Sequence, residues 1–533
     1  MSTSQHVEVE ESMTEPVPMT PEDIQQDKHS SLIKRAKSIQ ARVPIIVVAL
    51  AVAILTFFVH GYRLSSGPDV FSDEGLYLLV GLSVAKGGGL TINNSPFLYH
   101  PPAYFLIEAA YLKLLRLTDT DLLTALFSVR YLNIFFSAAT ATLLLFFGRK
   151  LHSYRAGLLM VALFLMDPYV QRINRRNMLE TFTMLCLLAG FYIFFTSQRR
   201  LKTWQWLGAG IALGLMALTK EALIPYLLAL LGMIFWACRT QLVDALRTIA
   251  VAVCLYACYP LWAFTAGEWH DYVALKSTEF GWVAGAPSGS SLTASSQKTF
   301  SFENVQKLLG QYATSYILVA VAGMMLLVLL LFFRQRREAR FLLVWSSFSF
   351  AYVFVLARTS DQYLYFLIVP AAIITNGYGL SLLLQSVRYR RWLRSGVSIF
   401  LCLLLLFNSG EWIYTYGYKS DDGYAKILAY VQTHIPPDEP IVLSDDVGYY
   451  LLPSDYTIRF DRTKTSILEL RDHYFIMSSK DRWGGYNATT PEFYDWVIHN
   501  SKPILVEQEN TFWTIGLYYF KGSVDHQPRL RER

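Results

Sequence analysis

Long apolar runs recur from residue 44 to residue 412, and no other feature restricts the fold of this chain as strongly. A helix crosses a bilayer only if about 20 consecutive residues are mostly apolar, because lipid cannot hydrogen-bond to the backbone. Charged residues make up 17% of the 533 residues, against about 25% in soluble domains. The sequence therefore predicts a polytopic α-helical membrane protein. About eleven transmembrane helices are expected, near 44–62, 127–148, 157–172, 178–197, 204–220, 222–237, 246–265, 311–333, 341–357, 361–384 and 396–412.

Basic residues indicate how the chain crosses the membrane. Four of them lie between positions 34 and 42, just before the first apolar run, so the positive-inside rule places the N-terminus in the cytoplasm. Residues 1–40 lack apolar periodicity and are rich in Ser, Thr, Gln and Pro, which predicts a disordered cytoplasmic tail. Every second connection further along the chain is basic, as this orientation requires.

The segment 100–117 must not cross the membrane, because counting it as a span would put the later basic connections on the wrong side. Its Glu108, Lys113 and Arg116 suit an interfacial helix that lies on the outer surface. The first outer loop then covers residues 63–126 and contains interfacial helices.

An odd number of spans leaves residues 413–533 outside, and the loop 266–310 also faces that side. Short apolar segments interleave with amphipathic ones in this C-terminal stretch, which is typical of a small α/β domain. Strands are expected at 440–444, 456–460, 474–478 and 503–507, and helices at 423–435 and 491–500. The net charge of +6 sits in short clusters between apolar runs, so it does not indicate nucleic-acid binding.

The segment DPYVQRINRRNMLETF, residues 167–182, departs from the pattern of outer connections poor in basic residues. It contains Arg172, Arg175, Arg176 and Glu180. An ionised residue at the bilayer centre costs roughly 2.5–3.5 kcal/mol, so three arginines belong at the interface. Either they contact anionic headgroups, with Arg176 and Glu180 forming an i, i+4 pair, or their guanidinium groups bind a phosphate.

Further polar residues fall at the same predicted membrane face. Each of them alone is more simply an interfacial anchor, but polar groups that converge at helix ends indicate a cavity open to that side. The residues are Asp73, Glu74, His100, Lys220, Glu221, Arg358, Asp361, Gln362, Tyr363 and Tyr365.

Several short motifs together resemble one family. They are Asp73-Glu74 followed by Tyr77, the glycines 87–89, HPPAYF at 100–105, Arg130, and MLE at 178–180. This set resembles the GT-C glycosyltransferases, in particular the protein O-mannosyltransferase and ArnT-like (aminoarabinose transferase) branch, family 39 and its bacterial relatives. The resemblance covers nearly the whole chain after residue 40.

The resemblance implies that residues 41–412 form a GT-C transmembrane catalytic domain in a bacterial inner membrane. It implies a hexosyl- or pentosyltransferase of class EC 2.4 whose sugar donor is linked to a polyprenyl phosphate. The lipid would lie in the bilayer and the sugar in an outer-face cavity. Asp73 corresponds to the catalytic carboxylate of the family and Glu180 to its second acid.

The chemistry fits these residue types. An acceptor hydroxyl that attacks an anomeric carbon needs a base, and a positioned carboxylate contributes about 10²–10⁴-fold. We therefore expect Asp73, Glu74 and Glu180 to be catalytic, with Asp73 as the base of an inverting displacement. Glu180 leaves the retaining route open. The departing phosphate needs cations, and the predicted donor-binding residues are Tyr77, His100, Arg172, Arg175, Arg176, Lys220, Arg358 and Tyr363.

No cofactor other than a divalent metal ion is suggested. In the ArnT-like branch a Glu and a Lys stand where this chain has Tyr99 and His100, so the metal site of that branch does not carry over directly. Candidate ligands are Asp73, His100, His270 and Glu279.

Two rival interpretations belong to other classes. A transporter or flippase of a lipid-linked sugar would place polar groups near the bilayer midplane, in two related halves. A scaffold or receptor would bind partners through the C-terminal domain. The charges gather at one face and no repeat is apparent, which favours a transferase acting on a glycan, lipid or protein acceptor.

Overall fold

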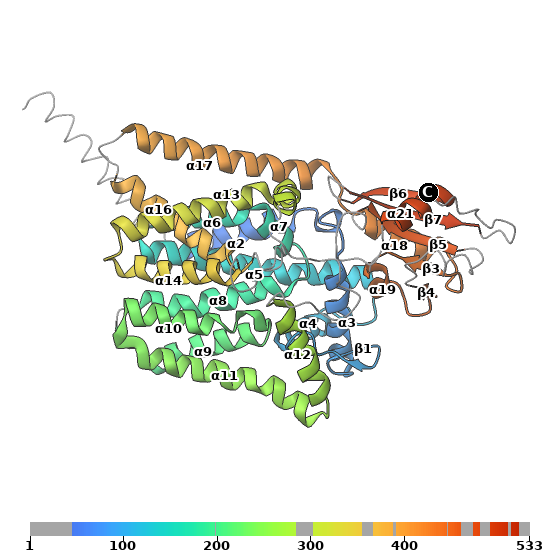
Figure 1. Ribbon diagram of the computed structural model, residues 1–533, viewed down its shortest axis with the longest axis horizontal. Helices are drawn as coiled ribbons and strands as arrows, with labels where there is room; N and C mark the ends of the chain where they lie inside the picture. Colours follow the sequence, from blue (N-terminus) through green and yellow to red (C-terminus); the bar gives the residue numbers. More distant parts are fainter. Residues whose placement is uncertain are drawn as a thin grey trace, which may run out of the picture. The chain divides into compact units, whose positions relative to one another are not determined.

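The computed structural model describes residues 45–197, 199–283, 302–353, 366–386, 391–444, 446–459, 473–479, 491–509 and 513–521. Up to residue 412 the described chain is almost entirely helical (Figure 1). The long helices are α2 (Ile45–Gly61), α5 (Leu122–Leu151), α6 (Tyr154–Met166), α8 (Leu179–Thr196), α9 (Thr203–Ala217), α10 (Tyr226–Ala237), α11 (Leu242–Thr265), α13 (Phe302–Phe332), α14 (Arg337–Ala351), α16 (Val369–Ser386) and α17 (Arg391–Trp412).

The membrane-spanning character predicted from the sequence is confirmed, but the count of eleven spans is not. Each predicted run overlaps a helix, yet only six helices in the described part of the chain are long and apolar enough to cross a membrane. A seventh results if α6 and the short α7 (Pro168–Asn174), which meet at 70°, form one span. Helices such as α9, with 15 residues, rise only about 22 Å, less than the hydrocarbon thickness of about 30 Å.

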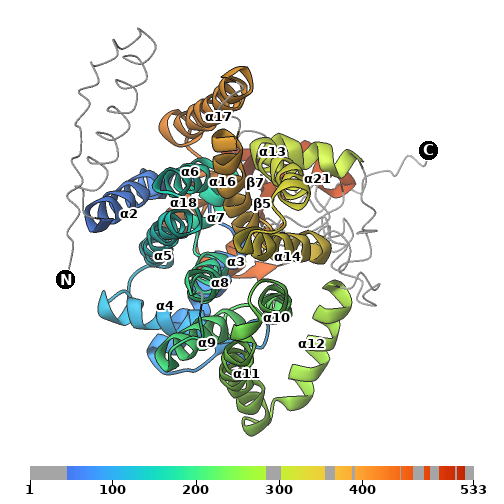
Figure 2. The same ribbon diagram turned by 90° about the vertical axis from the view of Figure 1, so that its left-hand side faces the viewer.

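The helices pack as layers of neighbours along the chain. Helix α8 contacts both α5 and α9, α9 packs along α11, and α13 packs against α16 (Figure 2). Helices α5 and α6 approach to backbone contact at a glycine pair, because a Cβ atom on Gly148 would lie 2.2 Å from the Gly157 nitrogen. Small residues that permit such close approach are typical of packed helices in membranes.

The loop after α2 folds into α3 (Ser72–Lys86), a two-stranded β1 (Thr91–Ile92) and β2 (Ser95–Pro96) ribbon, and α4 (Ala103–Leu114). Two acidic residues occupy the first turn of α3, where the helix dipole favours negative charge. The helix ends at the glycine run, where Gly87 adopts the left-handed conformation.

Helix α4 differs from the prediction in one side chain. Its 12 residues rise about 18 Å, too little to cross the hydrocarbon. Lys113 and Arg116 are exposed, as an interfacial helix requires. Glu108 was expected on the surface, but it is fully buried and its Oε1 accepts a hydrogen bond of 2.7 Å from the Asn177 amide. It faces the protein because a polar partner is available there.

The C-terminal stretch forms a five-stranded mixed sheet with strand order β4-β3-β5-β7-β6. Its strands are β3 (Ile441–Leu443), β4 (Ile458–Arg459), β5 (His473–Ser478), β6 (Lys502–Glu509) and β7 (Trp513–Phe520), and its helices are α18 (Gly423–His434), α19 (Val447–Leu451) and α21 (Pro491–Asn500). Strand β3 pairs in parallel with β4 and β5, whereas β7 is antiparallel to β5 and β6.

The four predicted strands and two predicted helices of this stretch are confirmed. Strand β7 was not predicted, although Ile515 and Leu517 alternate toward the core. Gly516 interrupts the run, and a glycine inside an apolar run weakens the sequence signal for a strand. The domain boundary at residue 413 stays a prediction.

One hydrophobic core joins the sheet to the transmembrane part. Leu78 and Leu82 of α3, Leu126 of α5, Ile427 of α18 and Leu517 of β7 all belong to it. A core shared by elements so far apart in the chain fixes α3 against the C-terminal sheet.

Asp69, just before α3, reinforces this junction. Its side chain is 4% exposed, and it accepts hydrogen bonds from the backbone nitrogens of Tyr424 (2.7 Å) and Ala425 (3.4 Å). These N–H groups lie in the first turn of α18 and have no partner within the helix. The carboxylate therefore caps α18 from a distant part of the chain.

We predict that Asp69→Ala lowers the free energy of unfolding by about 1–2 kcal/mol, because it removes a helix cap. Thermal unfolding of the purified protein in detergent measures the change. The control is Asp438→Ala, since Asp438 is exposed. An equal effect of the two substitutions would contradict the capping role.

Candidate active site

Glu74, on the first turn of α3, forms a buried ion pair with Arg130 of α5. Both side chains are fully buried. Arg130 donates from Nε to Oε1 at 2.9 Å and from Nη2 to Oε2 at 2.8 Å, which is a bidentate arrangement. Nη1 of Arg130 also donates to the Pro68 carbonyl at 2.7 Å. The pair therefore joins α3, α5 and the chain that leads into α3.

Glu74 has further partners on a third element. Its carboxylate accepts the backbone N–H groups of Phe71 (3.1 Å) and Asn177 (2.8 Å). Arg176 Nε lies 3.8 Å from Oε2. Asn177 and Arg176 belong to the turn between α7 and α8, so Glu74 holds that turn as well. The sequence analysis predicted a catalytic role for Glu74. In this structure its side chain is fully buried and presents no surface to a substrate.

Asp73 stands one residue earlier and is half-buried. One turn along α3 is Tyr77, which is buried and whose hydroxyl lies 3.1 Å from Nε2 of His100. Burial, and then the carboxylates of Asp73, Glu180 and Glu279, raise the pKa of Tyr77 well above its usual range. The charges of these three acids therefore all act on this phenol, although they come from α3, α8 and a later helix.

His100, between β2 and α4, is a neutral partner in this group. Burial lowers the pKa of its imidazole well below the usual range, and Lys220 and Lys276 lower it further. A neutral imidazole can both donate and accept hydrogen bonds. Tyr77 thus lies near both Asp73 and His100, and the roles expected for these three residues stay predictions.

Glu180 forms an ion pair with Lys220. Nζ of Lys220 also donates a hydrogen bond to Oε1 of Glu180. Lys220 Nζ also lies 4.8 Å from the ring centre of Phe366. Arg176, the partner expected for Glu180 on one interpretation, donates from Nη2 to the Asp69 carbonyl at 3.0 Å and approaches Glu74. A cation thus accompanies each of the two buried acids.

Arg175 was expected to contact either lipid headgroups or a phosphate, but its guanidinium group contacts backbone carbonyls instead. It is fully buried, and all three guanidinium nitrogens donate to backbone carbonyls. These contacts include His60 (2.9 Å), Tyr62 (2.7 Å) and Gly67 (2.7 Å), and the guanidinium lies 3.9 Å from the ring centre of Tyr416. Arg175 therefore fixes the chain between α2 and α3. Arg172, on α7, is half-buried.

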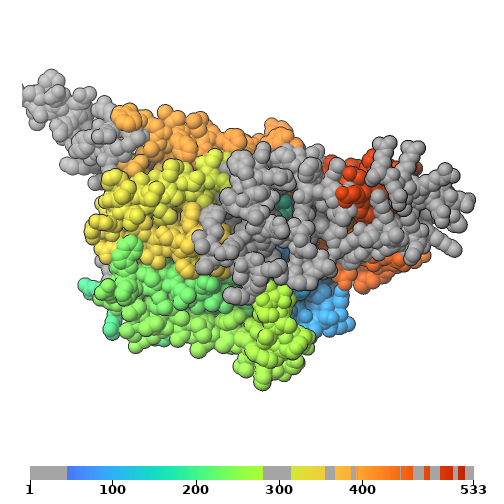
Figure 3. All heavy atoms as spheres, in the orientation of Figure 1, coloured from blue at the N-terminus to red at the C-terminus, as the bar shows by residue number. Residues whose placement is uncertain are grey.

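Lys276 was missed by the sequence analysis. It lies on α12 (Trp269–Val283). This helix is yellow-green in Figure 3, where it adjoins the blue surface of the early part of the described chain. Its Nζ contacts Glu221 at 2.6 Å, Glu279 at 2.9 Å and the carbonyl of Tyr99 at 2.9 Å. Burial raises the pKa of the Glu279 carboxyl to about 7, and Lys276 opposes that rise. A lysine in a long loop carries no sequence signal of such a position.

The predicted metal ligands do not form one site. His270 is exposed on the first turn of α12, next to Asp271, and is not grouped with Asp73. Nε2 of His100 faces the Tyr77 hydroxyl, and lysines stand beside Glu180 and Glu279. Among the residues that the structure describes, no three His, Cys, Asp or Glu side chains could hold a metal ion together. We derive no catalytic step through a metal.

Five predicted cavity residues lie outside the described residues. They are Arg358, Asp361, Gln362, Tyr363 and Tyr365.

Part of the chain is similar to a known protein family. Residues 99–264 match the family described as dolichyl-phosphate-mannose-protein mannosyltransferase. No curated protein matches this chain.

Two solved structures show the same fold. ArnT from Cupriavidus metallidurans bound to undecaprenyl phosphate is 13% identical with a TM-score of 0.55, and the match covers 89% of this chain and 97% of ArnT. The archaeal oligosaccharyltransferase AglB from Archaeoglobus fulgidus, in complex with an inhibitory peptide and a dolichol-phosphate, is 10% identical with a TM-score of 0.56. That match covers 90% of this chain and 75% of AglB. At such identities the likeness concerns the fold alone.

We predict that removing the charge of Glu74 lowers the stability of the protein, whereas removing the charge of its neighbour Asp73 does not. Glu74→Gln leaves Arg130 charged and without its buried carboxylate, which costs about 3–5 kcal/mol of stability. The matched control Asp73→Asn changes the half-buried neighbour and leaves the fold intact. Thermal unfolding and size-exclusion profiles of the purified variants measure the difference. Equal losses of stability would refute the structural role of Glu74.

Proposed function

We propose that this protein is a membrane glycosyltransferase that moves a sugar from a polyprenyl-phosphate donor to an acceptor hydroxyl, with Asp73 as the general base. The observation that carries the proposal is the position of Asp73. It is the half-buried acid of a group that also contains Tyr77, His100 and Lys220, and the adjacent Glu74–Arg130 pair fixes its helix. The description of the matched family, and the lipid phosphates bound to ArnT and AglB, support this donor class.

The proposed reaction is a single displacement. The acceptor hydroxyl gives its proton to the Asp73 carboxylate while its oxygen forms a bond to the anomeric carbon. The bond from that carbon to the phosphate oxygen breaks, and its electron pair leaves with the polyprenyl phosphate. One displacement inverts the anomeric centre. The ion pair of Glu180 with Lys220 supports inversion, because it engages the second carboxylate that a retaining route would use.

The leaving phosphate is already anionic, so it needs positive charge and not a proton. Lys220 and Lys276 are our candidates, since both act on His100 beside Asp73. Glu74, Arg175 and Arg176 hold the surrounding loops, by the contacts described above. Arg172, Arg358 and Tyr363 stay predicted donor-binding residues.

We propose further that the site faces the outer side of a bacterial inner membrane. The N-terminus would then be cytoplasmic, and residues 413–533 would lie outside. The basic clusters in alternate connections support this orientation. The acceptor, whether glycan, lipid or protein, would reach the site from that side.

The test is an assay in proteoliposomes with a radiolabelled polyprenyl-phosphate sugar. We expect transfer of the label to an acceptor hydroxyl, and Asp73→Asn should reduce it by about 10²–10⁴-fold while expression and unfolding temperature stay unchanged. Translocation of the intact donor without transfer would show a flippase instead. Full transfer by the variant would remove Asp73 from its proposed role.

The pH dependence of donor binding gives a second test. The pKa of Glu279 is about 7, so this carboxyl takes up a proton as the pH falls from 8 to 6. The local charge around Lys276 then becomes more positive, and we expect the KM for the anionic donor to fall. Glu279→Gln should remove this dependence and keep KM low throughout. The same pH profile in both proteins would contradict the assignment.

A further inference from the structure

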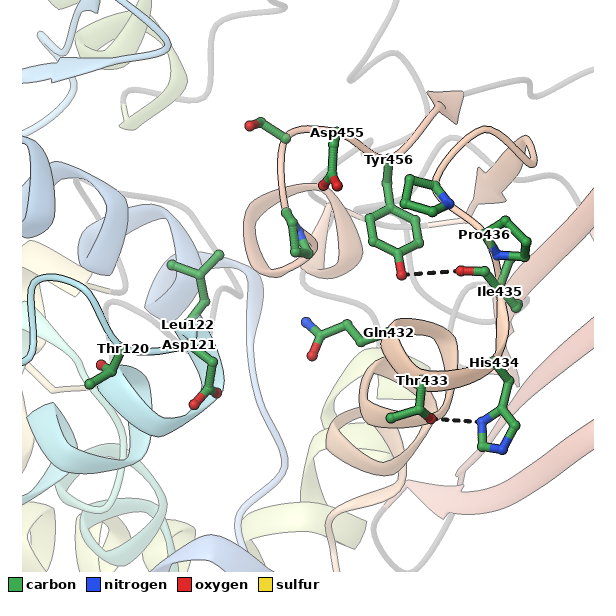
Figure 4. A pocket seen from close by; sticks show the side chains of 13 residues that line it. Thr120, Asp121, Leu122, Gln432, Thr433, His434, Ile435, Pro436, Asp455 and Tyr456 are labelled. Atoms are coloured by element: carbon green, nitrogen blue, oxygen red, sulfur yellow. Dashed lines mark hydrogen bonds between the residues drawn. The ribbon is translucent and has the colours of Figure 1, made fainter.

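A cavity of about 760 Å³ lies apart from the group around Asp73. One wall is the turn before α5, from Thr120 to Leu122 (Figure 4). The opposite wall is the last turn of α18 with the segment that follows it, and the loop 453–456 after α19. Ligand pockets commonly have volumes of about 300–1,000 Å³, so this cavity can hold a small ligand.

The side chains around the cavity combine hydrogen-bonding groups with ring faces. Gln432, Asp121, Asp455 and Tyr456 lie around its opening (Figure 4). The Gln432 carboxamide forms no hydrogen bond with the other side chains drawn there. Three prolines add further rigid ring surfaces.

Tyr456 is oriented by its hydroxyl, which donates toward the carbonyls of Val431 (3.3 Å) and Ile435 (3.2 Å). Its ring is therefore held as a wall of the cavity, and its polar end is satisfied. An aromatic ring face beside carboxylate and carboxamide groups suits a sugar, which has apolar C–H faces and hydroxyls around its edge.

The charge of the lining residues limits which class of ligand the cavity can bind. Among the thirteen described residues that line the cavity are two carboxylates, Asp121 and Asp455, and no lysine or arginine. Carboxylates repel a phosphate or uronate group at close range. The cavity therefore favours an uncharged glycan over an anionic one.

Helix α18 connects this cavity to the segment that leads into α3, the helix on which Asp73 lies. Its first turn is capped by Asp69, four residues before Asp73, and its last turn supplies Gln432 and His434. With 12 residues, α18 rises about 18 Å. A ligand at its far end would thus lie at a fixed distance from the base.

We propose that this cavity is a subsite for a neutral glycan, namely the part of the acceptor remote from the hydroxyl that is glycosylated. The proposal rests on the proposed transferase function and adds the chemical class of the acceptor. An acceptor several sugar units long would engage both places at once.

The test measures glycan binding to the full-length protein in nanodiscs by saturation-transfer NMR, with no donor present. The probes are maltotriose and mannotriose, which are neutral, and trigalacturonate, which is anionic. We expect at least one neutral trisaccharide to bind and trigalacturonate not to bind. Gln432→Ala and Asp455→Asn should each weaken binding about tenfold, through loss of one hydrogen-bonding group.

One control variant should bind the neutral probe as the unchanged protein does. Asp438→Asn removes an exposed carboxylate that does not line the cavity. Because both test residues are at least partly exposed, their variants are expected to fold, and thermal unfolding verifies this.

The proposal is overturned if neither neutral trisaccharide binds, if binding survives both test substitutions, if Asp438→Asn weakens it as much as they do, or if trigalacturonate binds equally well. These outcomes do not depend on transfer. Failure of the transferase function itself would appear separately, in the proteoliposome assay.

Discussion

The buried pair of Glu74 and Arg130 is the constraint on which the candidate active site of this protein depends. Removing two charges from water costs several kcal/mol each, and only close geometry with further hydrogen bonds offsets that cost. Glu74 meets this condition with partners from α5, from its own N-terminal turn and from the turn between α7 and α8. Three elements distant in the chain are thereby held at one point.

The same pair explains how two neighbouring acids can differ in role. Successive residues on a helix point about 100° apart, so Glu74 faces α5 while Asp73 faces the group of Tyr77 and His100. The inward acid fixes the helix by its pair with Arg130, and the outward acid is thereby held beside Tyr77. Preorganisation of this kind lets a base act without reorganising its surroundings.

The sequence alone predicted most of the helices, because the physics of the bilayer requires long apolar runs in membrane-spanning segments and favours basic residues in the connections on one side. It also predicted that Asp73, Glu74 and His100 fall at one membrane face, because the positive-inside rule puts their loop on one side. It did not predict the role of Arg175 or the position of Lys276. A buried arginine that binds carbonyls looks the same in sequence as one that binds phosphate, and α12 lies near Tyr99 only through tertiary packing. Strand β7 was not predicted, because Gly516 interrupts its run of apolar residues and weakens the sequence signal for a strand.

The hydrophobic core shared by α3, α5, α18 and β7 has a consequence for biosynthesis. Long-range contacts cannot form until both partners exist. The segment with Asp73 leaves the ribosome more than three hundred residues before β7 does. The core around Leu78 of α3 is therefore complete only after β7 has been made. A nascent chain stalled before β7 would lack part of the packing that fixes α3.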